Sequence, residues 1–145
     1  MGKHFIAVLM VLGLIFGSTT IVTAATIPIT LIDGDWQNSV PASGPAYPAV
    51  VISNSGATGG LSTARWGNPV GLYQSGYNFT STPTTPTFNV FSNGTPFILG
   101  EFVHLNFPVY APSLQSIDLG FNLGIDAILP PLTATVSFTH EETPN

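Results

Sequence analysis

The segment from residue 116 to residue 125 alternates strictly between apolar and polar residues. Its sequence is SIDLGFNLGI, in which every odd-numbered residue is apolar and every even-numbered residue is polar or glycine. A period of two places successive side chains on opposite faces of an extended strand, so one face can pack on a core while the other meets water. The segment therefore predicts a half-buried β-strand.

The same kind of pattern recurs in shorter segments along the chain. We expect further strands at 27–31, 49–53, 61–66, 77–80, 88–91, 97–105 and 134–138. Turn-forming residues stand between them, at Asp33-Gly34, Ser43-Gly44-Pro45, Gly59-Gly60, Gly67-Asn68-Pro69, Ser92-Asn93-Gly94 and Pro130-Pro131. No window has helical spacing together with caps. Many short strands joined by turns predict an all-β chain, folded as an antiparallel β-sandwich or a jelly-roll-like domain.

The composition agrees with this fold class. The chain has 145 residues, enough for one domain, and 44% of them are hydrophobic. It holds 15 glycines and 13 prolines, which favours short strands and turns over long helices. It has no cysteine, so neither a disulfide nor a thiolate metal site can form.

Charged residues are scarce, at 6% of the chain, against about 25% in an average protein. The basic residues are Lys3 and Arg65 alone, and seven acidic residues face them. Nucleic-acid binding depends on Lys and Arg side chains that neutralise phosphates, so we exclude nucleic acid as a partner. The same shortage of basic residues excludes electrostatic attachment to anionic lipid.

The first 25 residues have the pattern of a secretory signal peptide. Lys3 supplies the positive charge, residues 5–16 form an apolar run, and Val22-Thr23-Ala24 offers small residues to a signal peptidase. The apolar run is too short to cross a bilayer core of about 30 Å. We expect a signal-peptide helix in residues 1–25, cleavage near Ala24 or Ala25, and a β-sandwich domain over 26–145. The protein would then be secreted or held at the cell surface, with no membrane span after cleavage.

The segment FVHLNFP, residues 102–108, resembles the Thr-His-x-Asn-x-Pro signature of a family of exported bacterial proteins. These are the THxN or choice-of-anchor K domain proteins, many of which carry a PEP-CTERM sorting tail. Other elements match in the family's order, at Asp35-Trp36, Trp66-Gly67, 74–77, 95–100 and 140–145. The residues of this chain that fall on the family's motifs are His104, Asn106, Pro108, Trp36, Trp66, His140 and Glu142.

The resemblance implies a non-enzymatic protein of the cell surface or extracellular matrix, in bacteria that make exopolysaccharide. The chain departs from the family pattern in two ways. Val103 replaces the motif's Thr, and the family domain continues through further strands beyond the element at 140–145. A sandwich that lacks its last strands would expose unpaired backbone groups and apolar surface. We therefore expect a truncated member of the family that is marginally stable or associates.

His104 and His140 are the histidines outside the leader. Catalysis by His104 would need a nucleophile, and Ser62 lies in a segment that lacks the last glycine and the helix of a nucleophile elbow. Two widely separated histidines are also few for a metal site. We favour a structural His104, with its ring nitrogens bonded to nearby backbone and Asn106 fixing the turn before Pro108. Ligand contact, metal binding and catalysis stay open as alternatives.

Asp33-Gly34-Asp35 is the best candidate for a cofactor site, and the cofactor would be Ca²⁺. Calcium prefers about six to eight oxygen ligands, and a short Asp-x-Asp segment can supply two of them. The full EF-hand pattern is absent, and a turn between two strands uses the same residue types. We favour the turn at this position and expect no other cofactor.

Aromatic rings and carboxylates support two further hypotheses. A sugar-stacking platform could use exposed rings, although core packing is favoured for the two tryptophans. The residues considered for it are Trp36, Trp66, Tyr47, Tyr73, Tyr77 and Tyr110, and those considered for ligand contact are Trp36, Trp66, Tyr77 and His104. Glycoside hydrolysis needs two carboxylates that flank a bond, and Glu101 could pair with Glu141 or Glu142.

Two classes of function follow. The first is an exported, non-enzymatic protein that binds or organises extracellular polysaccharide or surface proteins. The alternative is a secreted carbohydrate-active enzyme, and a non-functional truncated remnant is a third possibility.

Export can be tested with the leader alone. Residues 1–25 fused to a reporter enzyme that is active only outside the cytoplasm should give activity in a bacterial host. Two charges in the apolar run, Leu12→Arg with Leu14→Arg, should abolish that activity because the run would no longer be apolar. Equal reporter activity from the native and the charged leader would contradict the assignment.

Overall fold

The computed structural model describes residues 25–42, 50–84, 88–91, 96–126 and 128–141. The predicted leader, Tyr47, Glu142 and the turns expected at 43–45 and 92–94 lie outside these residues. All regular structure within the described ranges is β-structure. Those ranges therefore contain no helix with the length and apolar character needed to cross a membrane.

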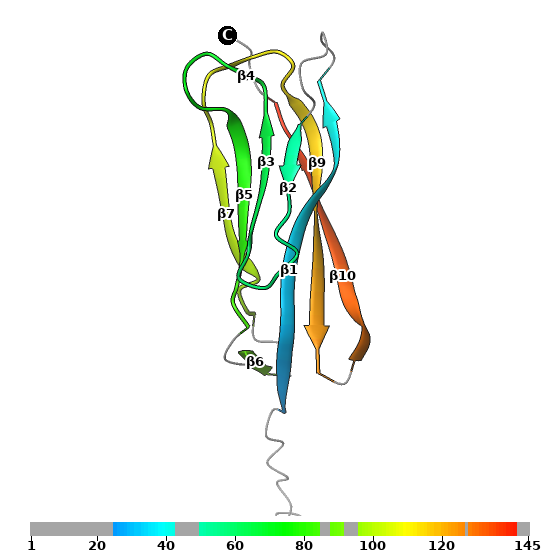
Figure 1. The fold of residues 1–145 in the computed structure, drawn as a ribbon. Helices are drawn as coiled ribbons and strands as arrows, with labels where there is room; N and C mark the ends of the chain where they lie inside the picture. Colours follow the sequence, from blue (N-terminus) through cyan, green and yellow to red (C-terminus); the bar gives the residue numbers. More distant parts are fainter. Residues whose placement is uncertain (1–24, 43–49, 85–87, 92–95, 127, 142–145) are drawn as a thin grey trace, which may run out of the picture.

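The described strands form two four-stranded sheets and one two-stranded sheet (Figure 1). The first sheet has the order β10 (Ile128–Thr139), β9 (Leu114–Ile125), β1 (Thr26–Pro41) and β6 (Phe88–Phe91). The second has the order β2 (Val51–Ser53), β3 (Leu61–Trp66), β5 (Ser75–Ser81) and β7 (Gly100–Leu105). A short ladder joins β4 (Asn68–Pro69) to β8 (Val109–Tyr110). Neighbouring strands are antiparallel throughout, which confirms the predicted all-β sandwich.

The core lies between the two four-stranded sheets. The alternation at 116–125 has the predicted effect, since Ile117 and Leu119 of β9 are buried and face the second sheet while Asp118 and Gly120 lie on the other face. The buried hydrophobic residues are Ile29, Ile32, Trp36, Ala64, Trp66, Tyr77, Phe79, Val109, Leu114, Ile117 and Leu119.

Two of the expected turns are wrong. Asp33-Gly34 lies inside β1, which continues without a break from Thr26 to Pro41. Gly34 is needed there because a Cβ atom would come within 2.4 Å of the Phe79 ring, so the glycine marks a close approach of the sheets. Pro130-Pro131 lies inside β10, where the register with β9 shifts between Ile128 and Leu132. Proline is tolerated at this position because β10 is an edge strand.

One long side of the sandwich is closed by hydrogen bonds between the sheets. The side chain of Asn54 accepts from the backbone N–H of Trp36 at 2.9 Å and donates to its carbonyl at 3.0 Å. The indole Nε1 of Trp36 also donates to the carbonyl of Ser62 at 3.2 Å. Asn54 thus pairs with the edge of β1 in the way a neighbouring strand would, and it joins β1 to the β2–β3 side of the second sheet.

The opposite long side, between β7 and β10, is open for much of its length. The inward-facing residues of β10 pair with the core residues of β9, yet Leu132 is 50% exposed and Val136 is 47% exposed. On β7, Phe102 is 43% exposed although its ring contacts the core. Apolar side chains that belong to the interior face of each sheet therefore reach solvent along this side.

The Asn54 bridge predicts a measurable contribution to stability. Asn54→Ala leaves the backbone N–H and carbonyl of Trp36 without these partners, and we expect the free energy of unfolding to fall by about 1–3 kcal/mol. Asn89→Ala is the matched control, because Asn89 is an exposed residue of the short edge strand β6 and should change stability by less than about 0.5 kcal/mol. Urea unfolding measures both, and equal effects of the two variants would contradict the role of the bridge.

Candidate functional site

A cluster of aromatic rings fills the end of the sandwich where β7 and β10 approach each other. Its members are Trp36, Trp66, Tyr77, Phe102, His104, Phe138 and His140. Two ring pairs in this ring cluster join β7 to the C-terminal end of β10. Phe102 stacks on Phe138 with centroids 5.2 Å apart and planes 4° apart, and His104 meets His140 edge to face at 5.4 Å. These pairs close the open side at the C-terminal ends of β7 and β10.

His140 connects the end of β10 to the second sheet. Its Nδ1 shares a hydrogen bond of 2.8 Å with the hydroxyl of Tyr77, and its ring meets Trp66 edge to face at 4.9 Å. Its backbone N–H donates to the carbonyl of Gln115 at 2.8 Å. The histidine therefore has the hydrogen-bonded, packed environment of a structural residue.

His104 is exposed and lies at the end of β7. Its ring meets the ring of Tyr77 at a centroid distance of 5.0 Å and that of Trp66 at 6.4 Å. We expected its ring nitrogens to bond to nearby backbone. Among the described residues, its contacts are with aromatic rings. The imidazole is thus packed on one side and open to solvent on the other.

The strand end expected after His104 is present. β7 ends at Leu105, and residues 106–108 form the connection to β8. The hydroxyl of Ser75 holds this connection, because it donates to the carbonyl of Phe107 at 2.7 Å and accepts from its N–H at 3.1 Å. The carbonyl of Pro108 accepts from Val70 N–H at 3.1 Å, and Asn106 is exposed.

The rings proposed for ligand contact divide into buried and exposed groups. Trp36 and Trp66 are each 1% exposed and Tyr77 is 5% exposed, so these three rings offer no open face to a sugar. Tyr73 is 64% exposed and Tyr110 is 51% exposed. A stacking platform can therefore use the exposed tyrosines, and the tryptophans serve the core.

The exposed tyrosines belong to the two loops that the β4–β8 ladder joins at one end of the sandwich. Tyr73 stacks on Phe107 with centroids 5.2 Å apart and planes 30° apart, and the neighbouring Leu72 is 91% exposed. Tyr110 belongs to β8 and pairs with Asn68 of β4. We call Leu72, Tyr73, Phe107 and Tyr110 the end-loop patch.

Backbone pairing holds the two loops of the end-loop patch together, through the β4–β8 ladder and the Val70–Pro108 hydrogen bond. Within the first loop, Gln74 Nε2 donates to the carbonyl of Gly67 at 2.9 Å. Gly67 has a φ of 75°, a conformation that favours glycine, and a Cβ atom there would lie 2.6 Å from Val109. The loops are thus fixed by packing and hydrogen bonds before any ligand arrives.

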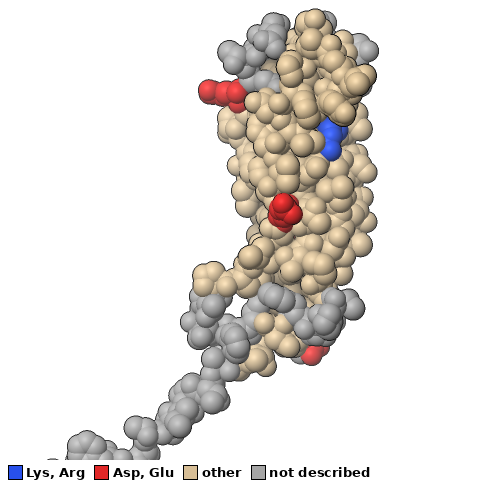
Figure 2. All heavy atoms as spheres, turned by 90° about the vertical axis from the view of Figure 1, so that its left-hand side faces the viewer, with Lys and Arg blue, Asp and Glu red and all other residues tan. Residues whose placement is uncertain are grey.

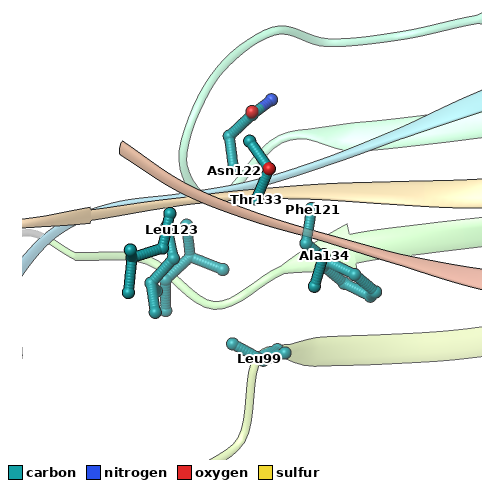
Figure 3. Close-up of a pocket in the computed structure, with 8 residues that line it drawn as sticks. Leu99, Phe121, Asn122, Leu123, Thr133 and Ala134 are labelled. Atoms are coloured by element: carbon teal, nitrogen blue, oxygen red, sulfur yellow. The ribbon is translucent and has the colours of Figure 1, made fainter. Parts of the chain in front are cut away.

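An apolar cavity of about 260 Å³ lies between the sheets on the open side. Figure 3 shows Leu99 across the space from Phe121 and Ala134, whereas Asn122 and Thr133 point away on the other side of the first sheet. Leu123, Leu132 and Ile32 complete the apolar lining. Such a cavity can take an apolar group, but its inner wall has none of the convergent polar groups that orient a substrate.

Asp33 and Asp35 lie two residues apart in β1, so they project to the same face of the strand. Asp33 is buried, and burial together with the nearby charge of Asp35 raises its pKa above the ordinary value of 3.8. Its Oδ1 has no hydrogen-bond partner among the described residues, while Asp35 Oδ1 accepts from Ser62 Oγ at 3.4 Å. The described residues include no group of three or more His, Asp or Glu side chains that could hold a metal ion.

The carboxylates considered for glycoside hydrolysis lie outside the ring cluster. Phe102 and His104 of β7 face inward. Glu101 directly precedes Phe102 in the strand, so its side chain projects to the opposite face. Glu141 is exposed and follows the end of β10, and Glu142 lies outside the described residues. Glu101 therefore does not orient the imidazole of His104.

No protein-family model matches the chain, and no curated protein matches its sequence. The family resemblance therefore depends on the motifs themselves. In the structure those motifs meet, because Trp36, Trp66, His104 and His140 all belong to the ring cluster, while Asn106 and Pro108 lie in the adjoining connection. Sequence analysis missed Phe102 and Phe138 as members of the cluster, although their alternation in strands could have placed them on the inner face.

The raised pKa of Asp33 predicts a pH dependence of stability. The folded state binds the Asp33 proton more tightly than the unfolded state, so this contribution to stability is full below pH 3.8 and is lost as pH rises through the folded-state pKa. Asp33→Asn should therefore raise the free energy of unfolding at pH 7 and change it little at pH 3.

Asp118→Asn is the matched control for that experiment. Hydrogen bonds from Ser137 and Asn38 lower the pKa of Asp118, so its contribution is present above pH 3.8 and is lost as pH falls through the folded-state pKa. This variant should lose stability at pH 7. Denaturant unfolding at both pH values measures the two effects, and a destabilised Asp33→Asn at pH 7 would show that the carboxylate has a partner the structure does not reveal.

Proposed function

We propose that the protein is an exported, non-enzymatic β-sandwich module that binds extracellular polysaccharide through its end-loop patch. The stacking of the exposed Tyr73 on the half-buried Phe107 is the observation that carries the proposal. Aromatic rings combine a broad apolar face with, in tyrosine, a polar tip, which suits a wet surface that must contact both the C–H faces and the hydroxyls of a sugar. The leader and the motif resemblance supply the extracellular setting.

The fixed conformation of the patch favours binding. Ligand binding costs free energy for every side chain and loop that must be ordered. Here the β4–β8 ladder, the Ser75–Phe107 hydrogen bonds and the Gly67–Val109 contact order the loops in the free protein. Tyrosine also loses little conformational entropy because it has few rotatable bonds.

The charges of the molecule favour a neutral polysaccharide over an acidic one. The face shown in Figure 2 carries few charged groups, and the net charge of the chain is −5. Arg65 is the one basic residue in the described ranges. Its guanidinium already donates to the carbonyls of Ala64 and Tyr77 and to Asn78 Oδ1, at 2.9, 3.0 and 2.6 Å. It is therefore engaged within the fold and is a poor partner for the carboxylates of an acidic polymer.

Binding should be measured with pull-down and calorimetry on neutral glucan and xylan, and on an acidic uronate polymer. Tyr73→Ala should weaken binding to the neutral polymers by about 3- to 10-fold, because one stacked aromatic contact contributes about 0.5–1.5 kcal/mol. Tyr73→Phe keeps the ring and should retain most of the affinity. Val51→Ala, at an exposed residue of β2, is the control for a general surface change.

The same polymers test the alternative, a secreted carbohydrate-active enzyme. Release of reducing sugar ends that is lost in Glu101→Gln would favour the enzyme. Binding that Tyr73→Ala does not weaken, or no binding to any neutral polymer, would contradict the proposed role of the patch.

A further inference from the structure

The four edge strands of the two large sheets differ in length and charge. On the first sheet the edges are β6, with four residues, and β10, with twelve. On the second sheet they are β2, with three residues, and β7, with six, one of which is Glu101. Natural sheets protect their edges by keeping them short or by placing a charge on them. β10 is the longest of these four strands and carries no charge, and proline protects only its start.

β10 exposes apolar side chains as well as an unpaired backbone edge. Pro130-Pro131 blocks pairing at its start, which leaves residues 132–139, LTATVSFT, available for a neighbouring strand. Leu132, Val136 and Phe138 belong to the inward row of this segment, and the first two are about half exposed. Half of the segment is β-branched, namely Val136 and three threonines, and this residue type favours strands.

The distribution of charge permits a second copy of the protein to approach this edge. Two copies of the protein repel each other over most of their surface because each has a net charge of −5. Residues 127–140 contain no Asp, Glu, Lys or Arg, so two β10 strands can approach without opposing like charges. The nearest acidic residues along the chain, Asp126 and Glu141, flank the segment at its two ends.

We infer that β10 is a dimerisation edge, at which β10 of a second copy of this chain pairs antiparallel across a two-fold axis. If this axis is perpendicular to the sheet, the inward-facing side chains of both copies lie on the same face of the joined sheet. Each residue must then oppose a partner residue whose side chain lies on that same face. Axes at Thr135 and at Val136 give overlaps of equal length within 132–139, and we place the axis at Thr135 because the overlap then includes the exposed Leu132. The four-stranded first sheets then join into one continuous eight-stranded sheet.

This register makes each pair of opposing residues complementary. On the inward face, Leu132 opposes Phe138 of the partner subunit and Ala134 opposes the partner's Val136. On the outward face, Thr133 opposes Ser137 of the partner subunit, and Thr135 opposes its own copy. Aromatic–aliphatic and Thr–Ser pairs are favourable cross-strand neighbours. The exposed inward side chains of β10 gain apolar neighbours, and the unpaired backbone edge gains its hydrogen bonds. The inference does not depend on polysaccharide binding.

The first test introduces a charge at the proposed axis. Thr135 is exposed on the outward face, so Thr135→Lys leaves the core intact but places two like charges directly opposite each other in the dimer. Sedimentation velocity of the full chain should show a dimer for the native protein and a monomer for this variant. Thr80→Lys, at an exposed residue of the central strand β5, is the control and should remain dimeric.

The second test reads the register directly. The described residues contain no cysteine and the sequence has none, so a single introduced thiol reports one position. Opposing Cα atoms of paired antiparallel strands lie about 4.5–5.5 Å apart, within the range that a disulfide spans. Thr135→Cys should therefore form a covalent dimer under mild oxidation, and Thr80→Cys should not. A mixture of Thr133→Cys and Ser137→Cys chains should likewise form mixed dimers.

Three results would contradict a dimer formed through β10. A native chain that sediments as a monomer at every protein concentration from about one to about ten micromolar would overturn the inference. A dimer that Thr135→Lys does not dissociate, or that cross-links equally at Thr80→Cys, would place the interface elsewhere and overturn it too. Circular dichroism of each variant verifies that the strand content is unchanged, so loss of the dimer is not loss of the fold.

Discussion

The packing of Trp36 between the sheets is the interaction on which the rest of the structure depends. Its indole is 1% exposed, stacks on Tyr77 at 5.4 Å and meets Phe138 at 5.7 Å, so one side chain contacts both sheets. Its backbone is held by Asn54 and its Nε1 by Ser62. Removing so large a side chain would leave a cavity at the centre of the ring cluster, at a typical cost of about 3–5 kcal/mol. The position of β1 against the second sheet, and with it the Gly34–Phe79 approach, follows from this contact.

The two long sides of the sandwich differ because they are closed by different kinds of interaction. On the β1–β2 side, a side-chain amide takes the place of a strand and satisfies the backbone. On the β7–β10 side, ring contacts and the Tyr77–His140 hydrogen bond bridge the gap at one end, and the apolar cavity lies along the same side. A strand pairing at β10 and a polysaccharide at the end-loop patch would use separate surfaces. A two-fold axis perpendicular to the sheet reverses strand direction, so the end-loop patches of the two copies would point in opposite directions. If the proposed function holds, such a dimer could join two polysaccharide chains.

Much of the fold could be predicted from alternation alone, and the errors have identifiable causes. The half-buried β9 was predicted nearly residue for residue, since its inward row is apolar and its outward row polar. Asp33-Gly34 has the composition of a turn, but a glycine at a close contact between sheets has the same composition, and only the position of Phe79 distinguishes the two. Pro130-Pro131 likewise has the composition of a turn, but an edge strand tolerates proline because one side of its backbone has no partner. The candidate site was harder to predict. Tyr73 is exposed and Tyr77 is buried, and the residues next to each tyrosine in the sequence do not indicate this difference.

The sequence by itself determined the β-class of the fold, the strand faces, the leader pattern and the low charge, because each depends on residues that are near neighbours in the chain. The tertiary structure decided which side of the sandwich is closed and which is open. It also brought His104 to His140 and Tyr73 to Phe107, across 36 and 34 positions of sequence. The physical reason is that burial and edge exposure depend on which strands become neighbours. Strand order is set by packing of the whole chain, and a local pattern of period two does not contain it.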